Sequence, residues 1–329
     1  MNSFPSTLQS FFSDRLIRER EASPHTIGSY SDTMRLLLAF AAEHLRTEPS
    51  KLHLHQLDAP LIGAFLDHLE HERGCSARTR NARLAAIRSL YRFAALRHPE
   101  DAAVIERVLA ISPKRHERAL VTFLNEPELD ALIAAPDPGT WTGRRDHAII
   151  IFLAQTGLRA SELISLSCGA VHLGTGPYVR SLGKGRKHRI TPLTKETVIV
   201  LRAWLAERDG QEQQPLFPTR AGRALSRGAL ARRLAVHAAV AAKRCPSLQA
   251  KPITPHVLRH TAAMRLLHAG TDTSVIALWL GHEQVETTQM YLHADLAIKE
   301  RALARTKPLD CKPGRYSPRD PLLKFLEAL

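Results

Sequence analysis

T-P-H-V-L-R-H-T-A-A-M-R-L-L-H-A-G, at residues 254–270, is the stretch around which the fold is organised. Thr254 is a good N-cap, and Pro255 suits the first helical position because its missing N–H would be unbonded there anyway. His256 then falls in the first turn, where free N–H groups and the helix dipole favour an anion. Arg259 lies three residues on and shares a face with His256. The spacing predicts a helix whose first turn can bind an anion.

The residues that follow continue the same pattern. Gly270 closes the predicted helix, and Gly281 closes a short helix after it, each suited to a left-handed C-terminal position. His282 comes directly after L-W-L-G, and Tyr291 lies nine residues further on, within T-T-Q-M-Y-L-H. Two histidines, an arginine and a tyrosine near an anion-binding helix start indicate a phosphate that is held and attacked by a phenol.

Size and composition favour a globular chain of two domains. The chain has 329 residues, is 44% hydrophobic, and holds no apolar run of membrane-spanning length. Its first residues show no basic segment followed by an apolar block, so we expect no signal peptide and no membrane association. The cysteines are far apart, which predicts neither zinc nor disulfides and suits a reducing cytoplasm. They are Cys75, Cys168, Cys245 and Cys311.

The charge indicates a polyanionic partner. The formal net charge is +14, and residues 213–271 contain many arginines and lysines but no aspartate or glutamate. A solvated helix face normally mixes both signs, so this stretch favours nucleic acid as the partner.

The first 100 residues read as a small all-helical unit. Apolar periodicity predicts helices over 7–45, broken at Ser23-Pro24, over 61–72, and from Ser76 onward. Seven arginines and no acid fall within 73–97. We expect DNA contacts from Arg78, Arg80, Arg83 and Arg88 in this basic helix, with phosphates as their targets. A surface helix whose charge serves only solubility is the open alternative.

Residues 101–118 are expected to be a linker, because prolines and mixed charge interrupt the pattern. Helices are predicted beyond it at 125–134, at 148–154 (ended by Gly157), from Arg159 onward, at 195–208 and at 226–242. Two short strands are predicted at 178–183 and 188–193. They flank G-K-G-R-K, a hairpin whose glycines allow close approach to Lys184. Arg159 needs a partner at its helix-to-helix turn, and Glu162 is the expected one.

Together these motifs resemble the tyrosine recombinase (phage integrase) family. T-G-L-R-A-S-E-L resembles its first box, G-K-G-R-K its lysine hairpin, and H-V-L-R-H-T, L-G-H and the tyrosine segment its second box. The resemblance covers a catalytic domain at 119–304 and, more loosely, a core-binding domain at 1–100, with a tail at 305–329. It implies a mainly helical fold: a SAM-like N-terminal domain and a mixed, mostly helical catalytic domain with a small antiparallel sheet.

The resemblance also implies a catalytic set, which is Arg159, Lys184, His256, Arg259, His282 and Tyr291. Tyr291 would attack the phosphate and form a 3′-phosphotyrosyl link. The two arginines would hold the non-bridging oxygens, and Lys184 would protonate the leaving oxygen. His256 would accept the tyrosine's proton or hold the phosphate, and His282 would donate a hydrogen bond to it. Further DNA contacts are expected from Arg186, Lys187 and Arg227.

No metal, nucleotide or other cofactor is expected, because the ester to tyrosine conserves the bond energy. The family resemblance implies a homotetramer on two duplexes, with sibling recombinases as further partners. The Q-M-Y-L-H context and the tail resemble those of recombinases carried by transposable elements. The apolar tip at 322–329 is expected to dock either on a neighbouring protomer or on its own domain.

Several alternatives stay open at this stage. A type IB topoisomerase uses the same ester but reseals the original strand, and an inactive relative would only bind DNA. His256 and His260 have the spacing of a zinc pair, although no third ligand is evident. His260 is otherwise expected to be structural or to support a residue that touches the phosphate, and Lys187 is a weaker candidate than Lys184 for the acid.

Overall fold

The computed structural model describes residues 3–115, 121–183, 188–281, 288 and 291. The chain divides into two compact units, residues 1–118 and residues 119–329. The expected fold class is confirmed: helices dominate both units, and the only sheet in the described part is small and antiparallel. No helix among the described residues is both long and apolar enough to cross a membrane.

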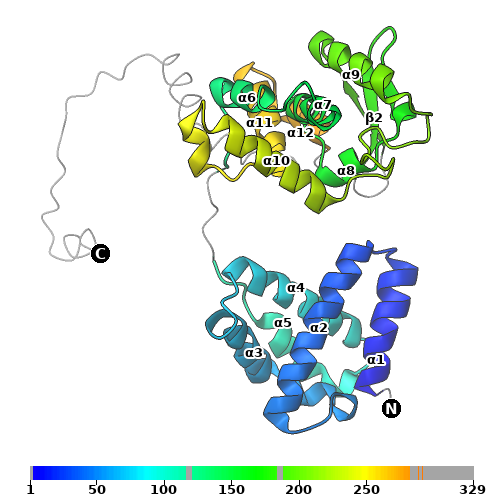
Figure 1. Ribbon diagram of the computed structural model, residues 1–329. Coiled ribbons are helices and arrows are strands. Elements are labelled where there is room, and N and C mark those ends of the chain that lie inside the picture. Colours follow the sequence, from blue (N-terminus) through cyan, green and yellow to red (C-terminus); the bar gives the residue numbers. More distant parts are fainter. Residues whose placement is uncertain (1–2, 116–120, 184–187, 282–287, 289–290, 292–329) are drawn as a thin grey trace, which may run out of the picture. The chain divides into compact units, whose positions relative to one another are not determined.

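The first unit is a helical bundle, and side-chain caps begin two of its predicted helices. Ser23 accepts a hydrogen bond from the backbone N–H of Thr26 at the start of α2, and Asp58 does the same for Leu61 at the start of α3. The elements are α1 Phe4–Ser10, the π-helix η1 Phe11–Glu19, α2 Pro24–Leu45, η2 Pro49–Lys51, η3 Leu54–Gln56, α3 Ala59–His71, α4 Ala77–Ala94, η4 Pro99–Asp101 and α5 Ala102–Ala110. Figure 1 shows α2, α4 and α5 packed together.

The predicted linker at 101–118 is wrong in its first half. Residues 102–110 form α5, which packs on α4 and buries Ile105 and Val108 in the core of the first unit. The i, i+3 spacing of these two residues is the helical signal, and the flanking prolines Pro99 and Pro113 obscured it. The connection between the units is therefore shorter than predicted.

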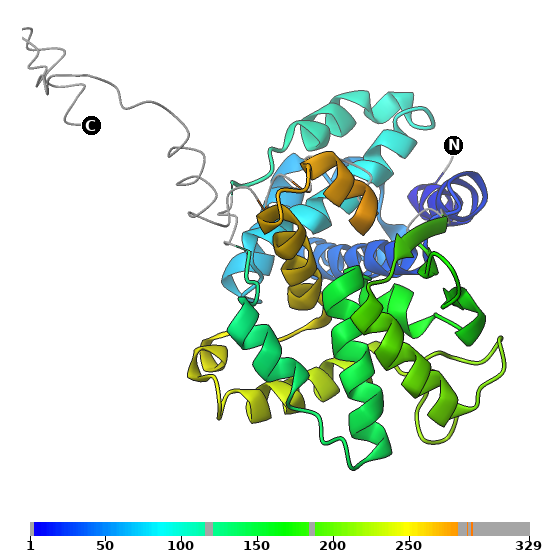
Figure 2. The same ribbon diagram turned by 90° about the horizontal axis from the view of Figure 1, so that it is seen from above.

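The second unit builds its core around α7. This helix packs against both α9 and α11 and lies between them (Figure 1, Figure 2). Most of its apolar residues, including Phe152 and Leu153, are buried. The elements are α6 Glu126–Ile133, α7 Trp141–Thr156, α8 Ala160–Ile164, η5 Cys168–Ala170, β1 Val171–His172, β2 Tyr178–Leu182, β3 His188–Pro192, α9 Lys195–Arg208, α10 Arg227–Ala241, η7 Pro246–Ala250, α11 Pro255–His268 and α12 Thr273–Leu280.

The sheet has the strand order β1-β2-β3, with both pairs antiparallel. β2 and β3 match the two predicted strands to within one residue, and Ser181 pairs with Arg189 near the hairpin end. The short strand β1 was not predicted, because two residues carry too little pattern to be read.

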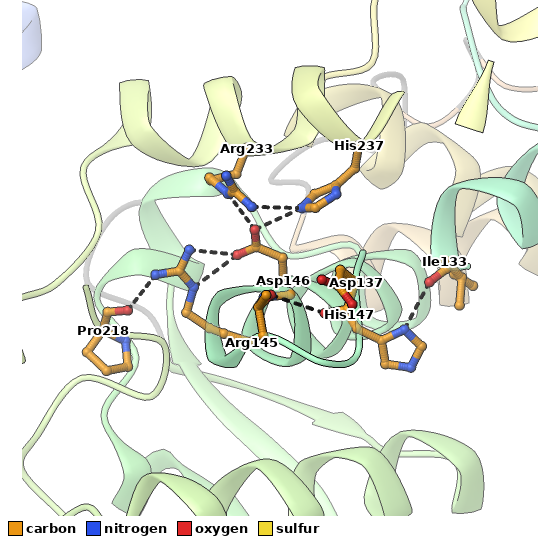
Figure 3. A network of polar contacts seen from close by, with 10 residues as sticks. Ile133, Asp137, Arg145, Asp146, His147, Pro218, Arg233 and His237 are labelled. Atoms are coloured by element: carbon orange, nitrogen blue, oxygen red, sulfur yellow. Dashed lines mark hydrogen bonds and ion pairs between the residues drawn. The ribbon is translucent and has the colours of Figure 1, made fainter. Parts of the chain in front are cut away.

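A buried polar network ties α7 to α10. Asp146 accepts hydrogen bonds from Arg145 on the same helix (Nη2–Oδ1, 2.7 Å) and from two α10 side chains: Arg233 (Nε–Oδ2, 2.5 Å) and His237 (Nε2–Oδ2, 2.8 Å), as Figure 3 shows. Arg145 also donates to the carbonyl of Pro218. Burial is the largest single influence on the pKa of the Asp146 carboxyl and raises it, but the hydrogen bonds from His237, Arg145 and Arg233 and the charge of Arg145 together hold this pKa below its usual value. One carboxylate thus fixes the basic helix α10 to the core.

Asp146→Asn is expected to destabilise the second unit by about 3–5 kcal/mol, because it leaves the guanidinium of Arg145 buried without its counter-ion. Urea unfolding followed by tryptophan fluorescence measures this effect. All three tryptophans, Trp141, Trp204 and Trp279, belong to that unit. Asp130→Asn is the matched control, because Asp130 is an exposed residue of α6, and it should change stability by less than about 0.5 kcal/mol. Equal effects of the two variants would contradict the network's role.

Candidate active site

The first turn of α11 forms as the sequence predicts. The Thr254 side chain accepts a hydrogen bond from the backbone N–H of Val257, and Pro255 occupies the start of the helix. His256 is exposed at this end, whereas Arg259, one turn further on, is only 2% exposed. The two side chains, with Arg159, line a cavity of about 280 Å³ whose remaining walls are Ala160, Thr254 and Pro255.

Arg259 joins three segments that are distant in the sequence. Its Nη1 donates to the carbonyl of Gly157 and its Nη2 to the carbonyl of Leu280, both at 2.7 Å. These carbonyls belong to the ends of α7 and α12. Gly281 adopts the predicted left-handed conformation, and Gly157, which was predicted to end its helix, is left-handed as well. Burial, and then repulsion by Arg159, lowers the pKa of the Arg259 guanidinium to about 10. It therefore remains charged at neutral pH.

Arg159 is held at the start of α8 by its predicted partner. Glu162 accepts from the Arg159 side chain (Nη1–Oε1, 2.7 Å) and from its backbone N–H (N–Oε2, 2.9 Å). A second guanidinium nitrogen of Arg159 donates to the carbonyl of Gly281 at 3.0 Å. The side chain is still 33% exposed, so it combines a fixed position with access to the cavity. The partner expected for Arg159 is confirmed.

Tyr291 lies in the same region and contacts His260. The Tyr291 Oη and the His260 Nδ1 are 3.1 Å apart, and the two rings meet edge to face. Tyr291 is 1% exposed and packs with Met264, Ile276 and Leu280. Burial raises the pKa of its phenol, and the charges of Arg259 and Arg159 oppose that rise. The phenol is therefore protonated at neutral pH and close to both guanidiniums.

The His260 imidazole is neutral at physiological pH. Burial, followed by the influence of His256 and Arg259, lowers its pKa to about 4. The His256 and His260 rings meet edge to face with centroids 4.3 Å apart. His260 Nδ1 contacts the phenol, and the described residues bring no third histidine, cysteine or carboxylate to His256 and His260 that would complete a zinc site.

The remaining predicted site residues have different outcomes. Lys184, Arg186, Lys187 and His282 lie outside the described residues, as does the tail at 305–329. Of the predicted DNA contacts, Arg78 and Arg227 are exposed, and Arg88 is half-buried. Arg83 is half-buried and donates to the Ser29 carbonyl and the Thr33 hydroxyl.

The DNA contact expected of Arg80 stays a prediction, and the structure gives this side chain a partner within the first unit. Its side chain is 7% exposed, and its Nε lies 3.4 Å from the carboxylate of Glu70 on α3. The helical face that α4 packs against the bundle includes this position, so Arg80 serves the fold of the first unit.

Two residues of the site were missed or undervalued in the sequence. His260 was expected to be structural or to support a residue at the phosphate, and the contact it makes is with the phenol itself. Arg189 on β3 was not assigned to the site, yet its Nη2 donates to Glu162 Oε2 at 2.9 Å. Neither contact has a local signal, because each joins residues separated by about 30 positions.

Comparison with known proteins agrees with this geometry. Residues 122–297 match the phage integrase family, and residues 8–98 match the N-terminal SAM-like domain of phage integrases. The chain is 54% identical over 322 residues to a Sinorhizobium fredii protein described as "Putative integrase/recombinase", and the match covers 98% of this chain and 97% of that one. It is 32% identical over 306 residues to tyrosine recombinase XerD of Pseudomonas putida, covering 90% and 96% of the two chains.

Solved structures share the fold. The Tn1549 transposon integrase in complex with transposon right end DNA has a TM-score of 0.69 at 17% identity, over 91% of this chain and 98% of that one. The XerH recombinase in a post-cleavage complex with its difH substrate has a TM-score of 0.68 at 22% identity, over 87% and 81%. With the family match spanning more than half of its length, the chain belongs to the phage integrase family of tyrosine recombinases, enzymes that cleave and rejoin DNA strands.

Proposed function

We propose that this recombinase cuts double-stranded DNA with Tyr291 as the nucleophile. The phenolic oxygen attacks the scissile phosphorus, the bond to the 5′-oxygen breaks, and a 3′-phosphotyrosyl ester and a free 5′-hydroxyl result. A 5′-hydroxyl from a second duplex then reverses the reaction and joins the strands. The observation that carries this proposal is the contact of Tyr291 with His260 in a region where two arginines also meet.

Each charged group near the cavity has a proposed role. Arg159 and Arg259 neutralise the non-bridging oxygens, because a planar guanidinium matches phosphate in a bidentate manner. His256, exposed at the same cavity, holds the phosphate. His260, rather than His256, takes the tyrosine's proton through Nδ1 when Nε2 carries the hydrogen. By family resemblance Lys184 protonates the leaving oxygen, and His282 donates a hydrogen bond to the phosphate.

The proposal needs no metal or nucleotide, because each ester formed has the energy of the one broken. We further propose that four copies act on two duplexes in the cytoplasm, together with sibling recombinases. The gene is proposed to belong to a transposable element, since the Tn1549 transposon integrase shares the fold. Arg78 and Arg227 are proposed to contact the phosphate backbone.

Trapping on a nicked duplex tests the proposal. Cleavage next to a nick releases a short oligonucleotide, so the covalent protein–DNA adduct accumulates. We expect the adduct on the 3′ side, a tryptic peptide containing Tyr291 bound to DNA, and joined products from two differently labelled duplexes. Resealing of the original strand alone would indicate a topoisomerase, and DNA binding without any adduct would indicate an inactive relative.

His260→Gln is expected to slow adduct formation by about 100- to 10,000-fold, the usual contribution of a positioned general base. Because the pKa of His260 is about 4 instead of 6.5, the imidazole stays neutral down to pH 5.5. The ratio of parent to variant rates should therefore be constant between pH 5.5 and 8. A ratio that shrinks steadily below pH 6.5 would show that His260 becomes protonated in that range and would contradict the assignment.

A further inference from the structure

Arg189 occupies a buried position at the hairpin end of β3. It pairs with Ser181 across the β2–β3 ladder, and its side chain is 10% exposed. Its Nη2 donates to Glu162 Oε2 at 2.9 Å, the oxygen that also accepts from the backbone N–H of Arg159. Arg189 therefore reaches the catalytic arginine through one shared carboxylate.

The charges around Glu162 do not balance. Among the described residues, the buried carboxylate of Glu162 is shared by Arg159 and Arg189, and Arg259 lies near enough for both of these arginines to lower its pKa. If Arg189 were absent, the negative charge of Glu162 would be matched by Arg159 alone, and Arg159 would have less charge to offer a phosphate. With Arg189 present, the cluster keeps a positive charge that only an anion can compensate.

Arg189 also touches the turn that ends α12. A Cβ placed on Gly281 would lie 2.5 Å from Arg189 Nη1, and Gly281 has a φ of +66°. Arg189 Nε and Nη1 are buried and have no hydrogen-bond partner among the described residues. The Gly281 carbonyl accepts from Arg159 on the same turn. Both arginines thus meet at Gly281. Burying the Arg189 guanidinium with two nitrogens that have no hydrogen-bond partner among the described residues is costly, and a shorter apolar side chain would be easier to bury at this position.

We propose that Arg189 is a positioning residue for DNA cleavage: by sharing Glu162 it fixes Arg159 and leaves the positive charge of Arg159 available to the scissile phosphate. This inference rests on the proposed function of the same site. Loss of Arg189 should therefore weaken the neutralisation of the phosphate charge and leave the protonation of the leaving oxygen unchanged.

Arg189→Gln is expected to slow cleavage by about 10- to 100-fold, the range seen when a partner that orients a site's ligands is removed. Cleavage is measured on three nicked duplexes that differ only at the scissile position. They contain an ordinary phosphodiester, a neutral methylphosphonate, or a phosphorothiolate with sulfur as the leaving atom. The methylphosphonate has lost the charge that Arg159 neutralises, so the defect of the variant should nearly vanish there. On the phosphorothiolate, which needs no acid, the defect should persist in full.

Two reference variants calibrate the pattern. Arg159→Ala should behave like Arg189→Gln on all three duplexes, whereas Lys184→Ala should be rescued by sulfur and not by the methylphosphonate. Arg180→Gln is the matched control, since it removes an exposed arginine from the same hairpin and should keep the parent's rates. An Arg189→Gln defect that is rescued by sulfur, or that is equally large on the methylphosphonate, overturns the proposal.

A double-mutant cycle separates positioning from general destabilisation. If Arg189 acts through Glu162, then adding Arg189→Gln to Glu162→Gln should change the rate by no more than about twofold. Additive losses would contradict the proposal. Should Arg189→Gln not fold by tryptophan fluorescence, Arg189→Lys keeps the charge and should show a smaller defect with the same substrate pattern. If the parent protein forms no Tyr291 adduct, the proposed function itself is refuted. If the parent is active but Arg189→Gln lacks the expected substrate pattern, only the proposal for Arg189 is refuted.

Discussion

Tyr291→Phe is expected to abolish the covalent protein–DNA adduct while DNA affinity stays within about threefold of the parent, because the phosphate contacts that dominate affinity remain. The substitution removes only the phenolic oxygen, and the ring keeps its packing against Met264, Ile276 and Leu280. The folded state loses the hydrogen bond to His260, which is worth about 1 kcal/mol. The nucleophile itself is absent, so cleavage should fall below detection. Adduct formation on nicked DNA and gel-shift titration at fixed salt measure the two quantities.

Tyr178→Phe provides the control for Tyr291→Phe. Tyr178 lies in β2 of the same unit, where its ring stacks on His172. Removing the Tyr178 hydroxyl should leave the rate of adduct formation equal to that of the parent protein. An adduct that persists in Tyr291→Phe would show that a different residue attacks the phosphate, and peptide mapping of that adduct would identify it.

Much of the fold could be predicted because its signals are local. A cap is a side chain that bonds to a backbone N–H two or three residues away, so Ser23, Asp58 and Thr254 mark helix starts in the sequence itself. The left-handed glycines Gly157 and Gly281 mark helix ends for a similar local reason. The Thr254 cap likewise places His256 and Arg259 in the first turns of one helix, whereas the full expected catalytic set came from the family resemblance.

The features that could not be predicted depend on contacts between residues that are distant in the sequence. Arg80 carries the same charge as its exposed neighbour Arg78, but the packing of α4 on α3 places it beside Glu70. In the sequence, Arg189 is one of several cations in a basic hairpin. Its contact with Glu162 on α8 depends on how the chain folds and is seen only in the structure. Residue type and spacing within an element carry no information on such pairings, whereas they do specify caps and turns.

Arg259→Lys is expected to reduce cleavage by at least about 100- to 1,000-fold, the usual effect of losing one preorganised donor to a developing oxyanion. Arg259 contributes in two ways at once. Two of its nitrogens bond to the carbonyls of Gly157 and Leu280, and we propose that its remaining donors bind the phosphate. A lysine ammonium keeps the charge, yet it cannot span both carbonyls and grip a phosphate as a planar fork does. The variant should therefore also lose about 1–3 kcal/mol of stability, since two buried carbonyls lose a donor.

Arg265→Lys is the matched control for this prediction. Arg265 lies on the same helix, is exposed, and makes a surface ion pair with Glu126 at 2.9 Å, so its replacement should change stability by less than about 1 kcal/mol and leave cleavage unchanged. The cleavage rate of Arg259→Lys is measured at saturating DNA and well below its unfolding midpoint, so that lost stability does not enter the rate. A rate near that of the parent under these conditions would make Arg259 a structural link between α7, α11 and α12 alone. A large loss of rate with normal DNA affinity would instead show that the guanidinium acts on the phosphate in the transition state, because only an interaction that strengthens there alters the rate without altering binding.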